Sequence, residues 1–174
     1  MNTVLEAIKN RRSIRKYKPD MVEQDKIDKI VEAGLYAASG MNRQATKIIV
    51  IKNKELRDKM SAEKRKIDGW QDGLDPFYGA PVVLVVLANT EQVTYIEDGS
   101  LVMGNLMLAA HALGVGSCWI HRAKEAFDLP EYKKFLESLG ITGNWVGIGY
   151  CILGYTDEEP VAQPRKPNRV YVVD

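Results

Sequence analysis

Apolar residues recur every three or four positions along much of the chain, which is the period of an amphipathic helix. This period predicts helices over residues 3–10, 24–38, 54–67, 95–113, 123–128 and 130–139. Asn53 supplies an N-cap for the third of these, and Ser39-Gly40 offers the glycine at which a helix commonly ends. The helix at 95–113 is apolar nearly all the way round. We therefore expect it to lie between layers or at a subunit interface.

Short apolar runs rich in β-branched residues separate these helices and predict strands. They cover residues 47–52, 82–88, 117–120 and 145–153, and a further run stands near the end at 170–173. The first run is expected to be a buried strand, and the second, which is apolar on both faces, a central one. Gly147 and Gly149 indicate that another element approaches the last long strand closely.

Two segments have no regular period. Residues 68–80 place Trp70 and Tyr78 among glycine and proline, which is typical of a long loop over a core. Residues 156–169 hold three prolines and are expected to be extended, with a reach of about 45 Å. A tail at 156–174 that ends in a strand without a partner predicts wrapping across the molecule or onto another subunit. We see no domain boundary and expect a single domain over residues 1–174.

Composition and charge are ordinary for a globular domain. The chain has 174 residues, of which 45% are hydrophobic and 27% charged, and a net charge of +1. Nearly balanced charge argues against bulk binding of nucleic acid or an acidic membrane, and no apolar stretch is long enough to span a bilayer. The chain starts in polar helix rather than a signal peptide, and Cys118 and Cys151 stand among apolar neighbours. We expect two buried free thiols and a cytoplasmic location.

Several kinds of active site are disfavoured because the sequence motifs they require are absent or misplaced. Gly114-Val115-Gly116 follows a helix and precedes a strand, the reverse of a dinucleotide-binding turn. His111 and His121 are the only histidines, and neither belongs to a set with the spacing of metal ligands, so we expect no metal. There is no phosphate-binding loop and no Gly-x-Ser-x-Gly turn. An enzyme without these parts is plausible if a bound cofactor carries the chemistry.

The basic stretch at residues 9–18 is the strongest local signal, because six of its ten residues are Lys or Arg. Arginine offers a planar fork of donors suited to phosphate oxygens, and Ser13 adds a hydroxyl. The alternative is a solvated run of charge that complements the end of the first helix. On this stretch alone, both interpretations stay open.

Four stretches in a fixed order change that balance. They are residues 11–17 (Arg-Arg-Ser-Ile-Arg-Lys-Tyr), 38–44 (Ala-Ser-Gly-Met-Asn-Arg-Gln), 98–119 with its Ala-Ala-His-Ala-Leu-Gly-Val-Gly-Ser-Cys-Trp end, and 154–167 with Pro-Arg-Lys-Pro at its end. Together they span most of the chain and resemble the nitroreductase family of FMN-dependent oxidoreductases. The resemblance implies an α+β fold, a three-layer α/β/α sandwich with helices flanking a mixed, mostly antiparallel sheet. It also implies an intertwined homodimer with the flavin at the subunit interface.

The same resemblance implies contacts to FMN for particular residues. The phosphate, the ribityl chain and the pyrimidine edge of the ring would meet Arg11, Arg12, Ser13 and Arg15. The tail would return to the phosphate with Arg165 and Lys166. A loop reaching a flavin held mainly by the other subunit would supply Ser39, Gly40, Asn42 and Gln44. The strand end beside the reactive flavin nitrogen would be Trp119, Ile120 and His121.

The implied activity is a ping-pong reaction in which NAD(P)H reduces the flavin and a nitroaromatic, quinone or similar acceptor then takes the electrons. No side chain is expected to act as a catalytic acid or base. The chain departs from many relatives at Ala38, where they have Pro, and at Ala45-Thr46, where they have Pro-Trp. Its short 68–80 loop leaves the acceptor open. Flavin fragmentation or dehalogenation within the same superfamily, and a non-enzymatic nucleotide- or anion-binding protein, are the alternatives.

Overall fold

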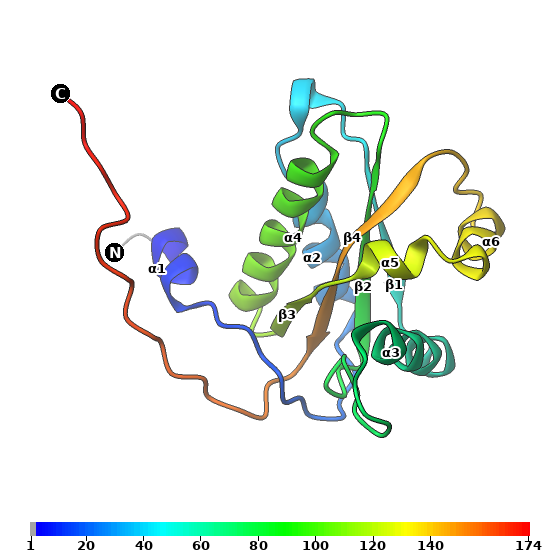
Figure 1. Ribbon diagram of the computed structural model, residues 1–174. Coiled ribbons are helices and arrows are strands. Elements are labelled where there is room, and N and C mark those ends of the chain that lie inside the picture. The colour runs from blue at the N-terminus through cyan, green and yellow to red at the C-terminus, as the bar shows by residue number, and fades with distance from the viewer. Residues whose placement is uncertain (1–2) are drawn as a thin grey trace.

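A computed structural model of the chain, which describes residues 3–174, contains one four-stranded sheet (Figure 1). Its strands are β1 (Thr46–Ile51), β2 (Val82–Asn89), β3 (Gly116–Ile120) and β4 (Trp145–Gly154), in the spatial order β1-β2-β4-β3. All three neighbouring pairs are antiparallel. The parallel component in the described residues is a single bridge between Ser13 and Ser117. The mostly antiparallel sheet is therefore confirmed.

Helices cover both faces of this sheet, which gives the three expected layers (Figure 1). One face carries α2 (Gln24–Leu35) and α4 (Tyr95–Ala112). The other carries α3 (Lys54–Asp68), α5 (Ala123–Phe127) and α6 (Pro130–Ser138). The short α1 (Thr3–Asn10) lies beyond α4 (Figure 1). No helix in residues 3–174 has both the length and the apolar character needed to cross a membrane.

Strand β2 forms the middle of the core, as its sequence predicts. Its residues from Val82 to Ala88 are all 0% exposed. Because successive side chains of a strand point to opposite faces, Val83 and Val85 pack under α3 and α5, while Leu84 packs under α2 and α4. Burial on both faces explains the uninterrupted apolar run.

The two glycines of β4 permit the close approach that the sequence indicates. A Cβ atom on Gly147 would lie 2.4 Å from the carbonyl oxygen of Ala123 in α5. A Cβ atom on Gly149 would lie 2.4 Å from Nε1 of Trp119 on the neighbouring strand. Position 147, where α5 crosses β4, therefore requires glycine.

Two boundaries differ from the prediction. The second helix ends at Leu35, not near residue 38, and the chain instead forms a 3-10 turn, η1 (Gly40–Asn42). The physical reason is an anchor on α4, where the Gly40 amide donates to Oδ1 of Asp98 at 2.9 Å. Strand β1 is an edge strand rather than a buried one, and in it only Ile51 is buried.

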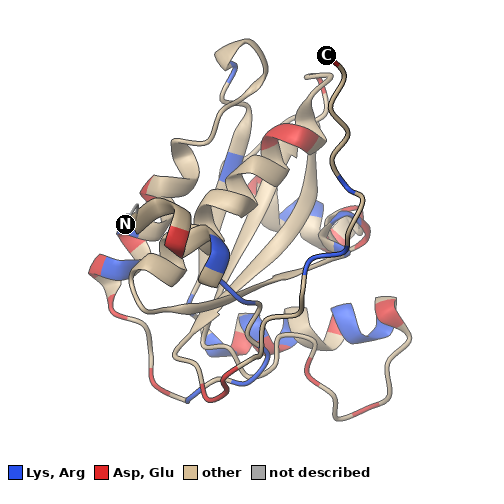
Figure 2. Cartoon of the chain, turned by 90° about the vertical axis from the view of Figure 1, so that its left-hand side faces the viewer, with Lys and Arg blue, Asp and Glu red and all other residues tan. Residues whose placement is uncertain are grey.

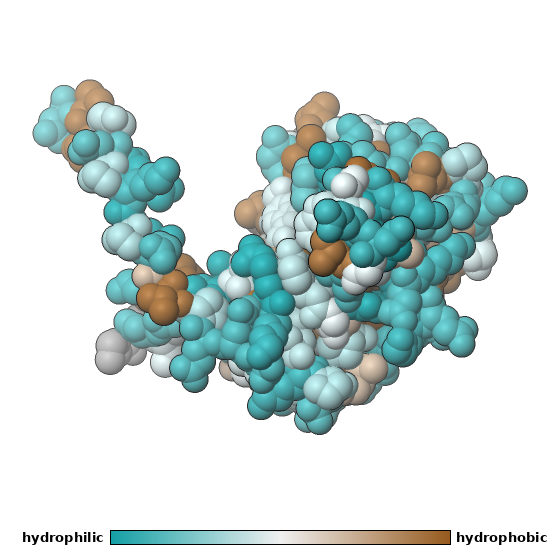
Figure 3. All heavy atoms as spheres, turned by 60° about the horizontal axis from the view of Figure 1, so that its bottom comes forward, coloured by the Kyte–Doolittle hydropathy of each residue, from teal (hydrophilic) through white to brown (hydrophobic). Residues whose placement is uncertain are grey.

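The tail is extended as expected, but its predicted strand does not form in this chain. Residues 157–174 contain neither helix nor strand, and they lead away from the end of β4 past α1 (Figure 1). Figure 3 shows the tail standing apart from the body of the molecule. Val170 and Val173 are 83% and 95% exposed. A strand needs a hydrogen-bonding neighbour, and within residues 3–174 none lies beside this segment.

Candidate functional site

The basic stretch is fixed in place by backbone pairing at its middle and at its C-terminal end. The Ile14 amide donates to the Ser117 carbonyl at 2.9 Å, at the outer edge of β3. Further along, the Lys18 amide donates to the Tyr155 carbonyl at 2.8 Å, beside the start of the tail. Ile14 is buried, so its arginine neighbours are carried on an anchored segment rather than on a free helix end.

A cavity of about 970 Å³ lies between this segment and the tail. Basic and polar residues predicted from the sequence line it, namely Arg11, Arg12, Ser13, Arg15 and Arg165. Figure 2 shows the Lys and Arg positions of both segments on the same side of the molecule. The fold therefore brings together the N-terminal arginines and the tail arginine, which are about 150 positions apart in the chain. We call this space the basic cavity.

The arginine side chains of the basic cavity differ in their partners. Nη1 of Arg11 is buried and has no hydrogen-bond partner among the described residues. A buried donor without a partner is rare and costs about 1–3 kcal/mol. Nη1 of Arg12 donates to the carbonyls of Lys9 and Arg11, at 2.7 and 2.8 Å. Arg11 is thus the side chain most in need of an anion.

A second cavity of about 330 Å³ shares Arg15 with the first. It contains the predicted strand end, Trp119, Ile120 and His121. The 68–80 loop closes it with Trp70, Pro76 and Tyr78, and the rings of Trp70 and Tyr78 meet edge to face at 6.4 Å between centroids. We call this space the ring cavity, because its aromatic and cationic lining suits a flat, polar-edged ring.

Sequence reasoning missed three charged residues of the ring cavity. They are Lys64 and Asp68 on α3 and Arg122 after β3. The side chains of Lys64 and Asp68 are 4% and 8% exposed and form an ion pair, and Nε of Arg122 lies 3.4 Å from Oδ1 of Asp68. The only available signal was the four-residue spacing of Lys64 and Asp68, which is common on exposed helices. In a helix as charged as α3 it could not be recognised.

The predicted loop residues Ser39, Gly40, Asn42 and Gln44 do not reach these cavities within the chain. They lie at the opposite end of α4 from the start of β3 (Figure 1). The Gln44 amide donates to Oγ of Ser39 at 3.0 Å, and Met41, Asn42 and Gln44 adopt left-handed backbone angles. Their contact with a flavin of another subunit stays a prediction.

Asp98 holds this loop and was not among the predicted site residues. Its side chain is buried and accepts hydrogen bonds from the Gly40 amide and from the Thr94 hydroxyl, the latter at 3.1 Å. A Cβ atom on Gly40 would lie 2.3 Å from Oγ1 of Thr94, so the turn needs glycine at that point.

Lys166 lies outside the basic cavity. It lines a shallow hollow along the tail together with Arg165, Asn168 and Arg169. Arg165 is thus the only tail residue that borders both spaces. Among residues 3–174, no three His, Cys, Asp or Glu side chains are grouped so that they could hold a metal ion.

Comparison with known proteins identifies the family. The sequence profile of the nitroreductase family matches residues 8–155. The chain belongs to the nitroreductase family. An Archaeoglobus fulgidus relative, provisionally named NADH dehydrogenase/NAD(P)H nitroreductase, is 32% identical and aligns over 91% of this chain and 88% of its own. A Bacillus subtilis relative named FMN reductase (NAD(P)H) is 26% identical over 96% of this chain and 71% of its own.

The fold agrees with this assignment. The crystal structure of a nitroreductase with bound FMN from Bacteroides fragilis matches the chain with a TM-score of 0.88 and 29% identity, covering 100% of both chains. The family and the three-layer fold implied by the sequence motifs are therefore confirmed.

Proposed function

We propose that the protein is an FMN-dependent oxidoreductase that passes electrons from NAD(P)H to a nitroaromatic, a quinone or a similar acceptor by a ping-pong mechanism. The observation that carries the proposal is the pair of cavities that share Arg15 in their lining. One is lined by cations and suits a phosphate, and the next is lined by aromatic groups and suits a ring. FMN has a phosphate at one end and a ring at the other, so the residues present fit it.

The basic cavity would hold the FMN phosphate. A phosphate dianion in a partly buried site needs several cationic hydrogen-bond donors. Arg11, Arg12 and Arg165 border the same space, and the buried Nη1 of Arg11 would gain its missing acceptor. Ser13 would add a hydroxyl donor.

The ring cavity would hold the isoalloxazine ring. Arg15 and Lys64 would face its pyrimidine edge, where the ring presents acceptors, and the strand end from Trp119 to His121 would border the ring. When bound, FMN supplies the hydride-accepting and electron-donating chemistry. The protein's own side chains bind the flavin, orient it and exclude water, so none is proposed as a catalytic acid or base.

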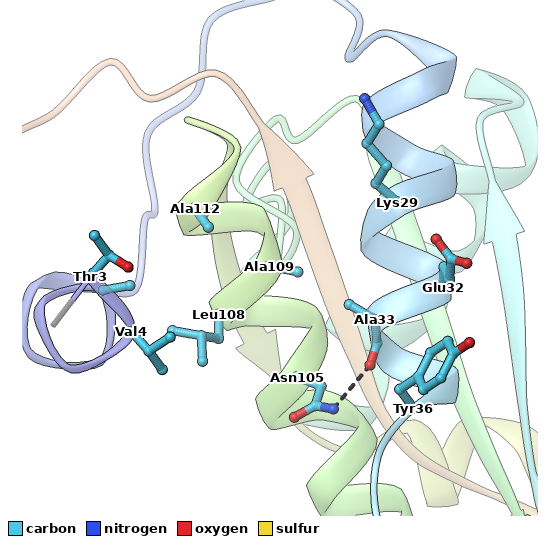
Figure 4. Close-up of a pocket in the computed structure, with 11 residues that line it drawn as sticks. Thr3, Val4, Lys29, Glu32, Ala33, Tyr36, Asn105, Leu108, Ala109 and Ala112 are labelled. Carbon is cyan, nitrogen blue, oxygen red and sulfur yellow. Dashed lines mark hydrogen bonds between the residues drawn. The ribbon is translucent and has the colours of Figure 1, made fainter.

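We further propose that the working form is a homodimer with flavin at the subunit interface. A groove of about 760 Å³ lies between α1, α2 and α4 and is lined largely by apolar groups, including Leu108, Ala109 and the ring of Tyr36 (Figure 4). Tyr36 is 82% exposed. Exposed apolar surface of this kind is typical of a contact between proteins. A second copy would cover it and bring its own Ser39–Gln44 loop toward the flavin.

The tail would complete this dimer by strand pairing. The outer edge of β3 is occupied by the bridge from Ser13, whereas β1 has no strand on its outer side among the described residues. An open edge strand is a template for another strand. We infer that residues 170–173 pair with β1 of the second copy.

The proposed function is tested by spectroscopy and turnover. The purified protein should be yellow with the absorbance bands of FMN, and it should oxidise NADH or NADPH when a nitroaromatic compound or a quinone is present. A colourless protein that added FMN does not stabilise against heat would contradict the proposal. Binding of FMN without NAD(P)H oxidation would favour the non-enzymatic alternative. The cytoplasmic location stays a prediction.

A further inference from the structure

Asp68 occupies an unusual place in the ring cavity. It is the last residue of α3, and Gly69 ends the helix in a left-handed conformation. The C-terminal end of a helix carries partial negative charge and favours cations, so an acidic residue there is locally unfavourable. Its side chain is nevertheless only 8% exposed. Residues that go against a local preference of this kind, at a buried position, are expected at functional sites.

The surroundings of Asp68 show what its charge does. Three basic side chains line the ring cavity, namely Arg15, Lys64 and Arg122, and His121 also borders it. Asp68 is the only acidic residue in that lining. It contacts two of the cations at once, because Lys64 bonds to Oδ2 and Arg122 lies 3.4 Å from Oδ1.

We propose that Asp68 is a positioning residue that sets the electron affinity of the bound flavin. It does so by neutralising Lys64 and by linking Lys64 to Arg122 through its two carboxylate oxygens. This inference rests on the proposed function. The inference concerns how strongly the site favours reduced over oxidised FMN. That preference depends on the charged groups around the ring, and it is not determined by whether FMN binds.

The direction in which Asp68 changes the affinity for reduced flavin follows from charge balance. When NAD(P)H gives up a hydride and becomes NAD(P)⁺, a flavin bound here would gain two electrons and one hydrogen nucleus, so the charge of its ring would become one unit more negative. Cations in a buried site stabilise that added charge, and a nearby carboxylate opposes them. Asp68 therefore lowers the affinity of the site for reduced flavin and keeps the electrons easy to pass on.

The test compares two matched substitutions in FMN-loaded protein. Asp68→Asn keeps the size of the side chain and an acceptor for Lys64 but removes the charge. We expect the ratio of dissociation constants for oxidised and reduced FMN to rise at least tenfold, which for a two-electron couple is a shift of about 30 mV to more positive potential. Asp72→Asn is the control, because Asp72 is a fully exposed acid four residues away, paired with Arg65 at 3.3 Å. Its midpoint potential should equal that of the unmodified protein.

Two more variants keep the test decisive if Asp68→Asn does not fold. Asp68→Glu retains the charge and should keep the midpoint potential near that of the unmodified protein. Arg122→Gln removes a half-exposed cation and should shift the potential in the negative direction. Full FMN binding with an unchanged potential in Arg122→Gln, and in Asp68→Asn if that variant folds, would overturn the inference and leave the proposed function standing. Failure of the unmodified protein to bind FMN would overturn the proposed function itself.

Discussion

Arg11 illustrates how a single buried donor predicts a ligand. Arginine is always charged at neutral pH, and its guanidinium carries five N–H donors. In this chain Nη1 is buried without a partner among the described residues, although the Arg11 backbone amide is satisfied by the Ala7 carbonyl at 3.0 Å. The backbone thus fixes the residue, and the side chain remains available for an anion.

Replacement of Arg11 by Ala should therefore weaken FMN binding and leave the fold intact. A charge-assisted hydrogen bond contributes about 1.5–3 kcal/mol, so the dissociation constant for FMN should rise about ten- to a hundredfold. Quenching of flavin fluorescence measures the affinity, and thermal unfolding without FMN measures the stability. Lys18→Ala is the control, because Lys18 belongs to the same basic stretch but does not line the basic cavity. Equal FMN affinity in the two variants would favour the alternative interpretation, in which the basic stretch is only a solvated run of charge.

Asp98 supports a different part of the site through the loop at Ser39–Gln44. Substitution by Ala would leave the Gly40 amide and the Thr94 hydroxyl without their buried acceptor. We expect a loss of about 1–3 kcal/mol in the free energy of unfolding, measured with urea. Its neighbour Glu97 is exposed, so Glu97→Ala should change stability little. Identical unfolding curves for the two variants would show that Asp98 does not anchor the loop.

The residues that sequence could and could not predict differ in kind. Arg11 and Arg165 were predictable because they belong to motifs that resemble a known family, and the fold brings them to one cavity. Lys64 and Asp68 were not, because their role depends on burial, and α3 carries many other Lys, Arg, Asp and Glu residues. A sequence pattern does not show which of several similar ion pairs the tertiary fold encloses.

At the scale of elements, the loop at 68–80 is fastened to α3 by Asp75. Its carboxylate accepts hydrogen bonds from the Ser61 hydroxyl, from the backbone amides of Phe77 and Gly79, and from Arg57. Nε of Arg57 also donates to the Ala80 carbonyl at 3.1 Å. These bonds hold the loop that closes the ring cavity.

Stability should depend on pH through this cluster. Burial raises the pKa of Asp75, but the hydrogen bonds from Ser61, Arg57, Phe77 and Gly79 outweigh it, and the net pKa lies below the usual range. A carboxyl group with a lower pKa in the folded state stabilises the fold above its unfolded pKa of about 3.9 and loses that contribution as pH falls through the folded value. Asp75→Asn should therefore be less stable at pH 7 and show a smaller further loss below pH 4, measured by urea unfolding at each pH. A curve parallel to that of the unmodified protein would rule out this role.

The helices and strands were predicted well where both faces of an element are buried. They were predicted poorly where burial depends on which other elements lie beside them. The apolar run of β2 is buried on both faces, and its prediction as a central strand is confirmed. The run at β1 is also rich in β-branched residues but lies at an edge, where Val50 is 39% exposed. The position of a strand in the sheet order depends on contacts that are remote in sequence. The early end of α2 has a similar cause, since the anchor at Asp98 lies 58 positions from Gly40.

At the scale of the whole molecule, the chain leaves apolar surface that a single copy does not cover. Val170, Tyr171, Val172 and Val173 are each at least 78% exposed, and hydrophobic atoms gather near the end of the tail (Figure 3). A run of valine and tyrosine residues this exposed is a hazard for aggregation unless it is paired. Pairing with β1 of a second copy would satisfy the backbone of both segments and extend the sheet by one strand.

Two variants should separate the role of this terminal strand from that of Arg165. Deletion of residues 169–174 removes the segment proposed to pair but retains Arg165, and it should convert the proposed dimer to a monomer in sedimentation experiments. Arg165→Ala retains the strand, so it should stay dimeric while its FMN affinity falls about tenfold or more, because one cation of the basic cavity is lost. If the deletion variant stays a dimer of unchanged affinity, residues 170–173 do not bridge the subunits. In that case the groove between α1, α2 and α4 would have to carry the dimer alone.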